Sequence, residues 1–347
     1  MRKLRVLETF RFIGAIIIAL GHFFDWNGGI DRMPRSFILS VEFFFILSAF
    51  VIVLKQNPEK ERTDEYLKKL FFKRTIRLLL PYMILLIIYY LFFFKLFYGK
   101  HVGLYNFIIN LFLLQILGLS GQLFSGISQV AWTLGLEYWG GTVFFSFIHY
   151  MQKKFKEGVF FIAIMIYVVS IGIFRNGSPN YLSPHFWTYS TVPFGILRML
   201  ASFSIGTLCA IFYKKYGNKK IKDKKIIFSI LEILIVLIII RFYGKVNYNR
   251  ENDYVFPIIG GIFILIFSYE DGIISKILKP FSILGALSYS IYLIHLIVME
   301  LMRYLKIENQ LSPLNIFLFL STVIVISFLF HYFIERKMIN LKYRLIH

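Results

Sequence analysis

Long apolar stretches alternate with short basic segments along almost the whole chain. Several of these stretches approach the roughly 20 apolar residues that cross the hydrocarbon core of a bilayer. The pattern therefore predicts an all-α integral membrane protein with a single transmembrane domain over residues 1–347. The candidate helices occupy residues 7–24, 37–54, 76–94, 104–119, 130–150, 159–174, 194–213, 226–242, 255–269, 281–305 and 314–334.

The basic residues predict which ends of these helices face the cytoplasm. Because Lys and Arg are enriched in cytoplasmic loops, both termini are expected to be cytoplasmic, together with residues 55–77, 152–157 and 214–225. This assignment allows only an odd number of crossings between residues 99 and 152, where two windows lie. We expect the short window 104–119 to be re-entrant, which requires burial in protein or contact with a cavity. About ten helices then cross the membrane.

Composition excludes several other classes of protein. With 58% hydrophobic residues, the sequence is too apolar for a soluble domain. The formal net charge is +20, but the Lys and Arg residues cluster beside apolar spans. Membrane lipid and topology explain such clusters better than nucleic acid does. A lone Cys209 and the lack of zinc-type Cys/His spacing predict no metal site and no permanently bound cofactor.

The first predicted helix carries two ionisable side chains at membrane depth. Arg11 and His22 are eleven residues apart, which places them on one helix face and about 16 Å apart along the axis. With the start of the chain inside, Arg11 lies towards the cytoplasm and His22 towards the outer face. Such residues mark functional sites by default. The alternative is that Arg11 reaches lipid phosphate and His22 only bonds to a neighbouring helix.

Two carboxylates are expected near the depth of His22. Glu42 begins the second apolar window from the outside, and Glu137 falls in the outer half of window 130–150. A carboxylate beside an imidazole fixes the tautomer of the ring and stabilises its protonated form. The alternative for each Glu is a carboxylate that faces interfacial water.

Arg74 and Arg77 lie three residues apart at the predicted cytoplasmic end of window 76–94. Two guanidinium groups on one helix face can bind phosphate oxygens with paired hydrogen bonds. Topology alone also explains basic residues at a helix end, but Arg11 is expected at a similar level.

The last two windows contribute further polar residues. Tyr292 and His295 are three residues apart on one side of a helix. An interfacial aromatic belt explains the tyrosine but not a histidine in the middle of a span. Glu335 and Arg336 close the last helix at the inner face, where an end-of-helix charge pair is expected.

Six segments, taken in order, resemble the acyltransferase-3 family of bacterial membrane O-acyltransferases across essentially the whole chain. Arg11 and His22 match its Arg-x10-His motif, and residues 74–77 match its Arg-x-x-Arg motif. Four other segments are similar to family stretches: residues 42–50 to DLFFVLSGF, 132–137 to WSLxxE, 288–295 to SYSLYLWH, and 332–336 to YxxIERP. Any one match is weak in so apolar a sequence, whereas six in the correct order are specific.

The resemblance implies transfer of an acyl group, usually acetyl, from cytoplasmic acyl-CoA to a hydroxyl of a surface or envelope carbohydrate. The acceptor would be an exported or lipid-linked glycan, the location the bacterial inner membrane, and no fused periplasmic domain is expected. The resemblance makes His22 the catalytic histidine and gives acyl-CoA-binding roles to Arg11, Arg74 and Arg77. To these we add Glu137 as a second catalytic residue by hypothesis, with the supporting residues Glu42, Trp132, Tyr292, His295 and Glu335.

The sequence departs from the family pattern at five positions. Glu42 replaces Asp, Ala49 replaces Gly, Thr133 replaces Ser, and Lys337 replaces Pro. Tyr138 stands where the family has an acidic or polar residue, which argues against a two-carboxylate arrangement beside Glu137.

The expected mechanism places the nucleotide of coenzyme A at the arginines and its thioester at His22. His22 would take the proton of the acceptor hydroxyl, with Glu137 or Glu42 orienting the ring. A covalent acyl-histidine route uses the same residues and remains open. The main alternative function is a transporter or flippase that moves an acyl group or glycan and consumes no thioester.

Overall fold

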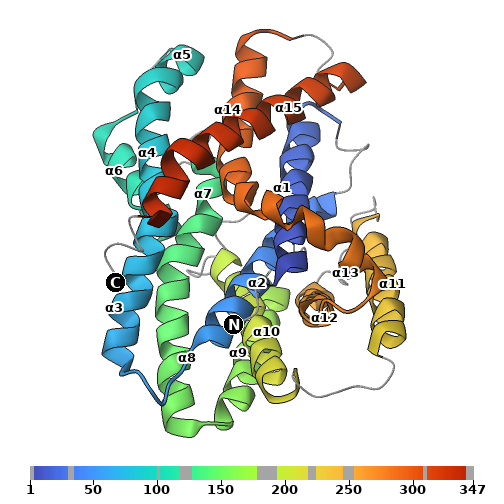
Figure 1. The fold of residues 1–347 in the computed structure, drawn as a ribbon. Helices are drawn as coiled ribbons and strands as arrows, with labels where there is room; N and C mark the ends of the chain where they lie inside the picture. The colour runs from blue at the N-terminus through green and yellow to red at the C-terminus, as the bar shows by residue number, and fades with distance from the viewer. Residues whose placement is uncertain are drawn as a thin grey trace.

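A computed structural model describes residues 4–29, 35–99, 102–117, 127–177, 194–217, 224–244, 254–307 and 311–340. Throughout these ranges the secondary structure is helical, and no strand occurs in them (Figure 1). The predicted all-α class is confirmed.

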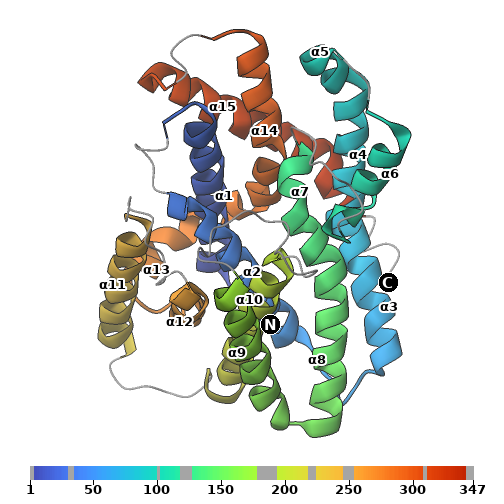
Figure 2. The same cartoon turned by 180° about the vertical axis from the view of Figure 1, so that it is seen from behind.

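Eight helices within the described ranges are long and apolar enough to cross a membrane. They cover Arg5–Trp26, Ser36–Lys55, Thr63–Tyr98, Gly158–Asn176, Gly195–Tyr216, Lys224–Tyr243, Ile273–Tyr304 and Pro313–Asn340. The remaining predicted crossings correspond to α12 (Phe256–Ser268), which is short and apolar, and to an unbroken helical run over residues 127–155. That run consists of α7 (Ile127–Gly135), η5 (Leu136–Gly140) and α8 (Gly141–Phe155) (Figure 2). The chain is therefore a multi-pass membrane protein.

Each of the other crossings is either a single helix or a run of helical segments that follow one another end to end. The single helices are α1 (Arg5–Trp26), α2 (Ser40–Lys55) after the short η1 (Arg35–Leu39), α9 (Gly158–Gly177), α10 (Phe194–Tyr216) and α11 (Lys224–Tyr243). One continuous run contains α3 (Thr63–Arg74), η2 (Thr75–Leu79), α4 (Leu80–Ile88), η3 (Tyr89–Phe94) and α5 (Lys95–Tyr98). The last two runs are α13 (Ile273–Leu278), η7 (Lys279–Leu287) and α14 (Ser288–Tyr304), then α15 (Pro313–Phe330) and η8 (His331–Glu335).

The segment predicted to be re-entrant contains no helix long enough to cross a membrane in its described part, residues 104–117. Its helix α6 (Leu104–Leu111) has 8 residues, a length of about 12 Å, which is far less than the hydrocarbon thickness. Leu113 then adopts a left-handed conformation, with φ 58°, before the short η4 (Leu114–Leu117). The indole Nε1 of Trp139 donates to the carbonyl oxygen of Phe112 at 2.9 Å, so the turn packs against the 127–155 run.

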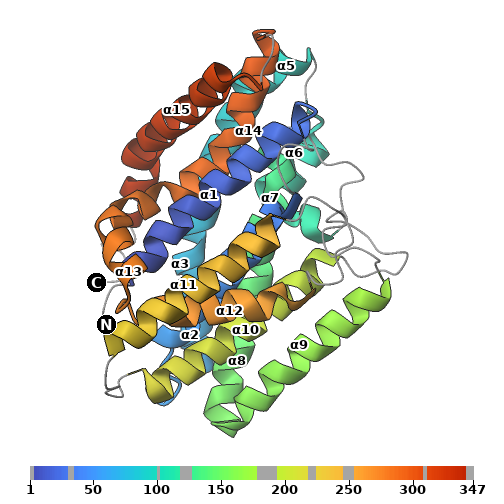
Figure 3. The same ribbon diagram turned by 90° about the vertical axis from the view of Figure 1, so that its right-hand side faces the viewer.

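Burial separates the central helices from the peripheral ones. The buried share of the most apolar 18-residue window differs between the spans. It is 67% for the spans of α2 and α10, but 17% for α11 and 22% for α9 and for the α15 run. The two central helices also approach each other closely, since a Cβ at Gly206 would overlap the backbone carbonyl of Ile46. The exposed apolar faces of the peripheral helices suit contact with lipid. The spans of α1 and α14 lie side by side (Figure 3) and are 50% and 56% buried, respectively, more than the peripheral helices.

Candidate active site

His22 of α1 contacts His295 of α14 in the interior of the bundle. The Nδ1 atom of His22 lies 3.0 Å from the Nε2 atom of His295. The two rings are nearly parallel, with an interplanar angle of 8° and a centroid separation of 5.2 Å. His295 is fully buried and His22 is partly buried. Two motifs 273 residues apart in sequence therefore meet at one pair of imidazoles.

The hydrogen bonds of this pair fix where the protons lie. The Nδ1 atom of His295 is 3.1 Å from the carbonyl oxygen of Ile291, one turn earlier in α14. A carbonyl only accepts, so Nδ1 of His295 is the donor, and Nε2 of the neutral ring is an acceptor. His22 must then donate from its own Nδ1. In the neutral ring the basic lone pair of His22 consequently lies on Nε2.

Tyr292 ties α14 to α7 beside the histidine pair. Its hydroxyl donates to the carbonyl oxygen of Val130 at 2.9 Å and lies 2.6 Å from the hydroxyl of Thr133. The Tyr292 and His295 rings are 6.0 Å apart between centroids. Thr133 keeps a hydroxyl at the position where the resemblance expects Ser, and this hydroxyl contacts Tyr292.

A group of charged residues lies at the other end of α1. Arg11 forms an ion pair with Glu8 at 3.0 Å, and their side chains are 21% and 31% exposed. Arg77 is exposed, and it interacts electrostatically with Arg11, Glu137, Glu8 and Glu335. Arg11 and Arg77 therefore belong to one accessible group of charges. This proximity agrees with the expectation that both lie at a similar depth in the membrane.

Glu137 lies with Arg74 rather than with the histidines. The guanidinium of Arg74 lies 3.7 Å from the Glu137 carboxylate and also donates to its backbone carbonyl. Ser48 donates to the same carboxylate at 2.9 Å. Within the described residues, Glu137 makes no hydrogen bond to His22, so the predicted contact between them is not formed. Its catalytic role stays a prediction.

Wide helical turns occur at three of the predicted site residues. The π-helical turns η2, η5 and η8 contain Arg77, Glu137 and Glu335, respectively. The sequence-based prediction assumed a regular α-helical twist, whereas a π-helical turn changes the direction of the side chains that follow it. Arg74 is buried and Arg77 is exposed, so the two arginines differ in accessibility, and their shared helix face stays a prediction. They remain electrostatic neighbours.

Glu42 and Trp132 share a partner that the sequence analysis missed. The Glu42 carboxylate lies 2.5 Å from Nη2 and 2.6 Å from Nε of Arg198, and both side chains are 0% exposed. The Arg198 guanidinium also lies 5.5 Å from the centroid of the Trp132 ring. The alternative of a water-facing Glu42 is therefore wrong. A lone arginine inside an apolar window was the available signal, because such a charge requires a partner.

Glu335 joins the last helix to α14. Ser290 and Nδ1 of His331 each donate to its carboxylate at 2.8 Å, and the side chain is buried. The predicted end-of-helix pair with Arg336 is wrong within the described residues, because the Arg336 guanidinium lies over the Tyr332 ring instead.

A family model described as an acyltransferase domain matches residues 5–332, which is nearly the whole chain. The match ends at the first residue of the last motif segment, residues 332–336. The chain belongs to the acyltransferase-3 family. No curated protein and no solved structure gives a significant match to this acyltransferase. Within the described residues, His, Cys, Asp and Glu form no group of three that could hold a metal ion.

The acyltransferase contains another buried carboxylate that sequence reasoning overlooked. Tyr89 donates to Glu300 at 2.6 Å, and Tyr98 donates to its other oxygen. Glu300 lies on α14, five residues after His295, and is 3% exposed. The two tyrosines thereby attach η3 and α5 to the helix that carries the buried histidine.

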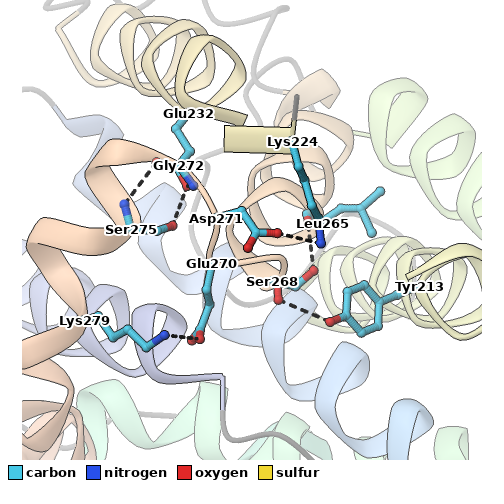
Figure 4. Close-up of polar contacts among 10 residues, drawn as sticks. All are labelled: Tyr213, Lys224, Glu232, Leu265, Ser268, Glu270, Asp271, Gly272, Ser275 and Lys279. Atoms are coloured by element: carbon cyan, nitrogen blue, oxygen red, sulfur yellow. Dashed lines mark hydrogen bonds and ion pairs between the residues drawn. The ribbon is translucent and has the colours of Figure 1, made fainter. Parts of the chain in front are cut away.

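A polar turn fixes the first turn of α1, which carries Glu8. Glu270 accepts from the backbone N–H of Val6 at 3.0 Å and pairs with Lys279 at 3.3 Å. Nearby, the buried Glu232 accepts backbone N–H groups of Gly272 and Ser275, so the turn is itself held in place (Figure 4). These contacts satisfy N–H groups that a helix start leaves without intrahelical partners.

Proposed function

We propose that this acyltransferase transfers an acyl group, normally acetyl, from cytoplasmic acyl-CoA to a hydroxyl of a surface or envelope carbohydrate in the bacterial inner membrane. The observation that carries the proposal is the arrangement along α1. A histidine with an oriented basic nitrogen lies at one end, and accessible arginines lie about 16 Å away along the helix axis.

The arginine end suits the phosphates of coenzyme A. Arg11 and Arg77 are accessible, and Lys55 at the end of α2 interacts electrostatically with Arg77. Guanidinium groups bind phosphate oxygens with strong, charge-assisted hydrogen bonds. In this proposal the nucleotide binds here, and the flexible pantetheine arm extends along α1 towards His22. Arg74, which is buried against Glu137, adds positive potential without direct contact.

The histidine end suits proton transfer during attack on the thioester. Nε2 of His22 takes the proton of the acceptor hydroxyl while the hydroxyl oxygen bonds to the thioester carbonyl carbon. The tetrahedral intermediate then expels the coenzyme A thiolate as its C–S bond breaks, and the thiolate takes the proton from the imidazolium. The products are the carbohydrate ester and free coenzyme A. His295 keeps the Nδ1–H of His22 engaged and therefore the ring oriented.

A direct assay tests this function. Purified protein in lipid is mixed with isotopically labelled acetyl-CoA and a panel of bacterial envelope glycans, and the products are analysed by mass spectrometry. The proposal predicts a labelled ester on one glycan and an equal amount of free coenzyme A. Vectorial movement of an acyl group or glycan without consumption of thioester would instead establish the transporter alternative.

A further inference from the structure

Glu8 pairs with one basic side chain and lies within electrostatic range of two others, and the three come from different helical segments. Its carboxylate pairs with Arg11 of α1 at 3.0 Å. It also interacts electrostatically with Arg77 of η2 and with Lys55 of α2. Glu8 is thus one of the anions, together with Glu137 and Glu335, that neutralise the cations to which the proposed function assigns the donor phosphates.

This arrangement differs from an ordinary pair along a helix. An isolated ion pair three residues apart on an exposed helix contributes little, because both side chains are mobile and hydrated. The backbone of Glu8 is held in place, since a Cβ at Gly285 of η7 would overlap its carbonyl oxygen and Glu270 binds Val6 nearby. The Glu8 carboxylate is only 31% exposed, so its charge acts in an environment that screens less than water does.

The three cations need an anion whether or not a donor is bound. Like charges that are brought together at membrane depth repel each other, and a carboxylate among them offsets that repulsion. A phosphate carries more negative charge than a carboxylate and would seek the same hydrogen-bond donors. The carboxylate and the phosphate therefore compete for one site.

We propose that the Glu8 carboxylate occupies the phosphate site of the empty protein and that the donor phosphate displaces it. Glu8 would then be a residue that sets donor affinity: it keeps the arginine group paired between turnovers, weakens the binding of donor, and favours release of free coenzyme A. The identity of the donor rests on the proposed function, whereas the competition between anions does not.

Binding of two anions to the full-length protein tests the proposal. Calorimetry would measure coenzyme A and inorganic pyrophosphate against wild type and Glu8→Gln in lipid nanodiscs. We expect Glu8→Gln to bind both probes about 10-fold more tightly, because a competing charge is removed. The gain should shrink at high salt, where exposed charges are screened. Glu8→Asp, which keeps the charge, should bind like wild type.

A matched control separates local competition from a general change in charge. Glu157→Gln removes the same charge from a side chain that is 90% exposed and pairs with Lys215 at 3.5 Å. It should change either affinity by less than about 2-fold, since such surface pairs contribute little.

The outcomes for the donor and for Glu8 are distinguishable. Wild type that binds pyrophosphate but not coenzyme A would contradict the proposed donor and leave the anion comparison intact. Glu8→Gln that binds both probes as wild type does, or more weakly, would overturn the role of Glu8 even if coenzyme A is the donor. Tighter binding that also occurs in Glu157→Gln would overturn it as well.

Discussion

The two ends of α1 hold their polar residues in different ways. At one end, His22 and His295 are joined by a hydrogen bond between rings whose protons are placed by a backbone carbonyl. At the other end, Arg11, Arg77 and Glu8 are held by opposite charges and remain accessible. A general base needs an unprotonated nitrogen, whereas an anion site needs positive charge. The comparison indicates that turnover and donor affinity depend on separate residues.

The largest effect is expected at the histidine end. His22→Ala removes the proposed base, and general-base catalysis typically contributes 10²- to 10⁴-fold, so kcat should fall by about that factor. Binding of coenzyme A should be unchanged, because the phosphates are bound at the other end of α1. Calorimetry and steady-state kinetics on the same preparation measure both quantities. Retained turnover in the folded variant would remove His22 from the mechanism.

The arginine end should respond in the opposite sense. Arg77→Gln removes an accessible guanidinium, and we expect the KM for acyl-CoA to rise about 10- to 100-fold with little change in kcat. Arg62→Gln is the control, since Arg62 is 73% exposed and pairs only locally with Asp64 at 3.1 Å. A fall in kcat with constant KM in Arg77→Gln would contradict the division between the two ends.

A smaller effect is expected from the residue that orients the base. His295→Leu leaves Nδ1 of His22 without this acceptor, and kcat should fall about 10-fold, because a base in the wrong tautomer or orientation transfers protons poorly. His295→Gln supplies an amide oxygen close to the position of Nε2 and should recover part of that loss. Equal activity of the Leu and Gln variants would show that His295 acts only through packing.

The smallest effect on turnover is expected at the sealed ion pair between Glu42 and Arg198, where both side chains are 0% exposed. Glu42→Gln leaves a buried guanidinium without its counter-charge, which typically costs about 3–5 kcal/mol of unfolding free energy. Turnover per folded molecule should stay close to that of wild type. Thermal unfolding and activity normalised to folded protein check the two statements, and a loss of activity without a loss of stability would contradict them.

The sequence predicts the fold well because lipid imposes simple rules. A span must be apolar and helical, so the apolar windows correspond to the observed helices. The described part of the window expected not to cross, residues 104–117, contains only the short α6 and η4. Arg11 and His22 also lie on one helix, as predicted, because α1 is regular from Arg5 to Trp26. The cytoplasmic location of the termini stays a prediction.

The candidate site was less predictable because its contacts depend on tertiary packing. Periodicity shows which face of a helix a residue occupies but not which helix covers that face. His22 was therefore expected beside a carboxylate, whereas α14 brings His295 to it. The π-helical turns η2 and η5 contain Arg77 and Glu137, and such turns, which redirect the side chains that follow them, cannot be read from periodicity. Arg198, the partner of Glu42, lies in a window with no motif of its own.

The tautomers of the two histidines test the central claim most directly. Nitrogen NMR on protein with ¹⁵N-labelled histidine, assigned with His22→Ala and His295→Gln, reports which ring nitrogen carries the proton. The structure predicts two neutral rings, each protonated at Nδ1, with the lone pair of His22 on Nε2. A His22 ring protonated at Nε2 and bare at Nδ1 would contradict the account, because its basic nitrogen would then face His295 instead of the acceptor hydroxyl.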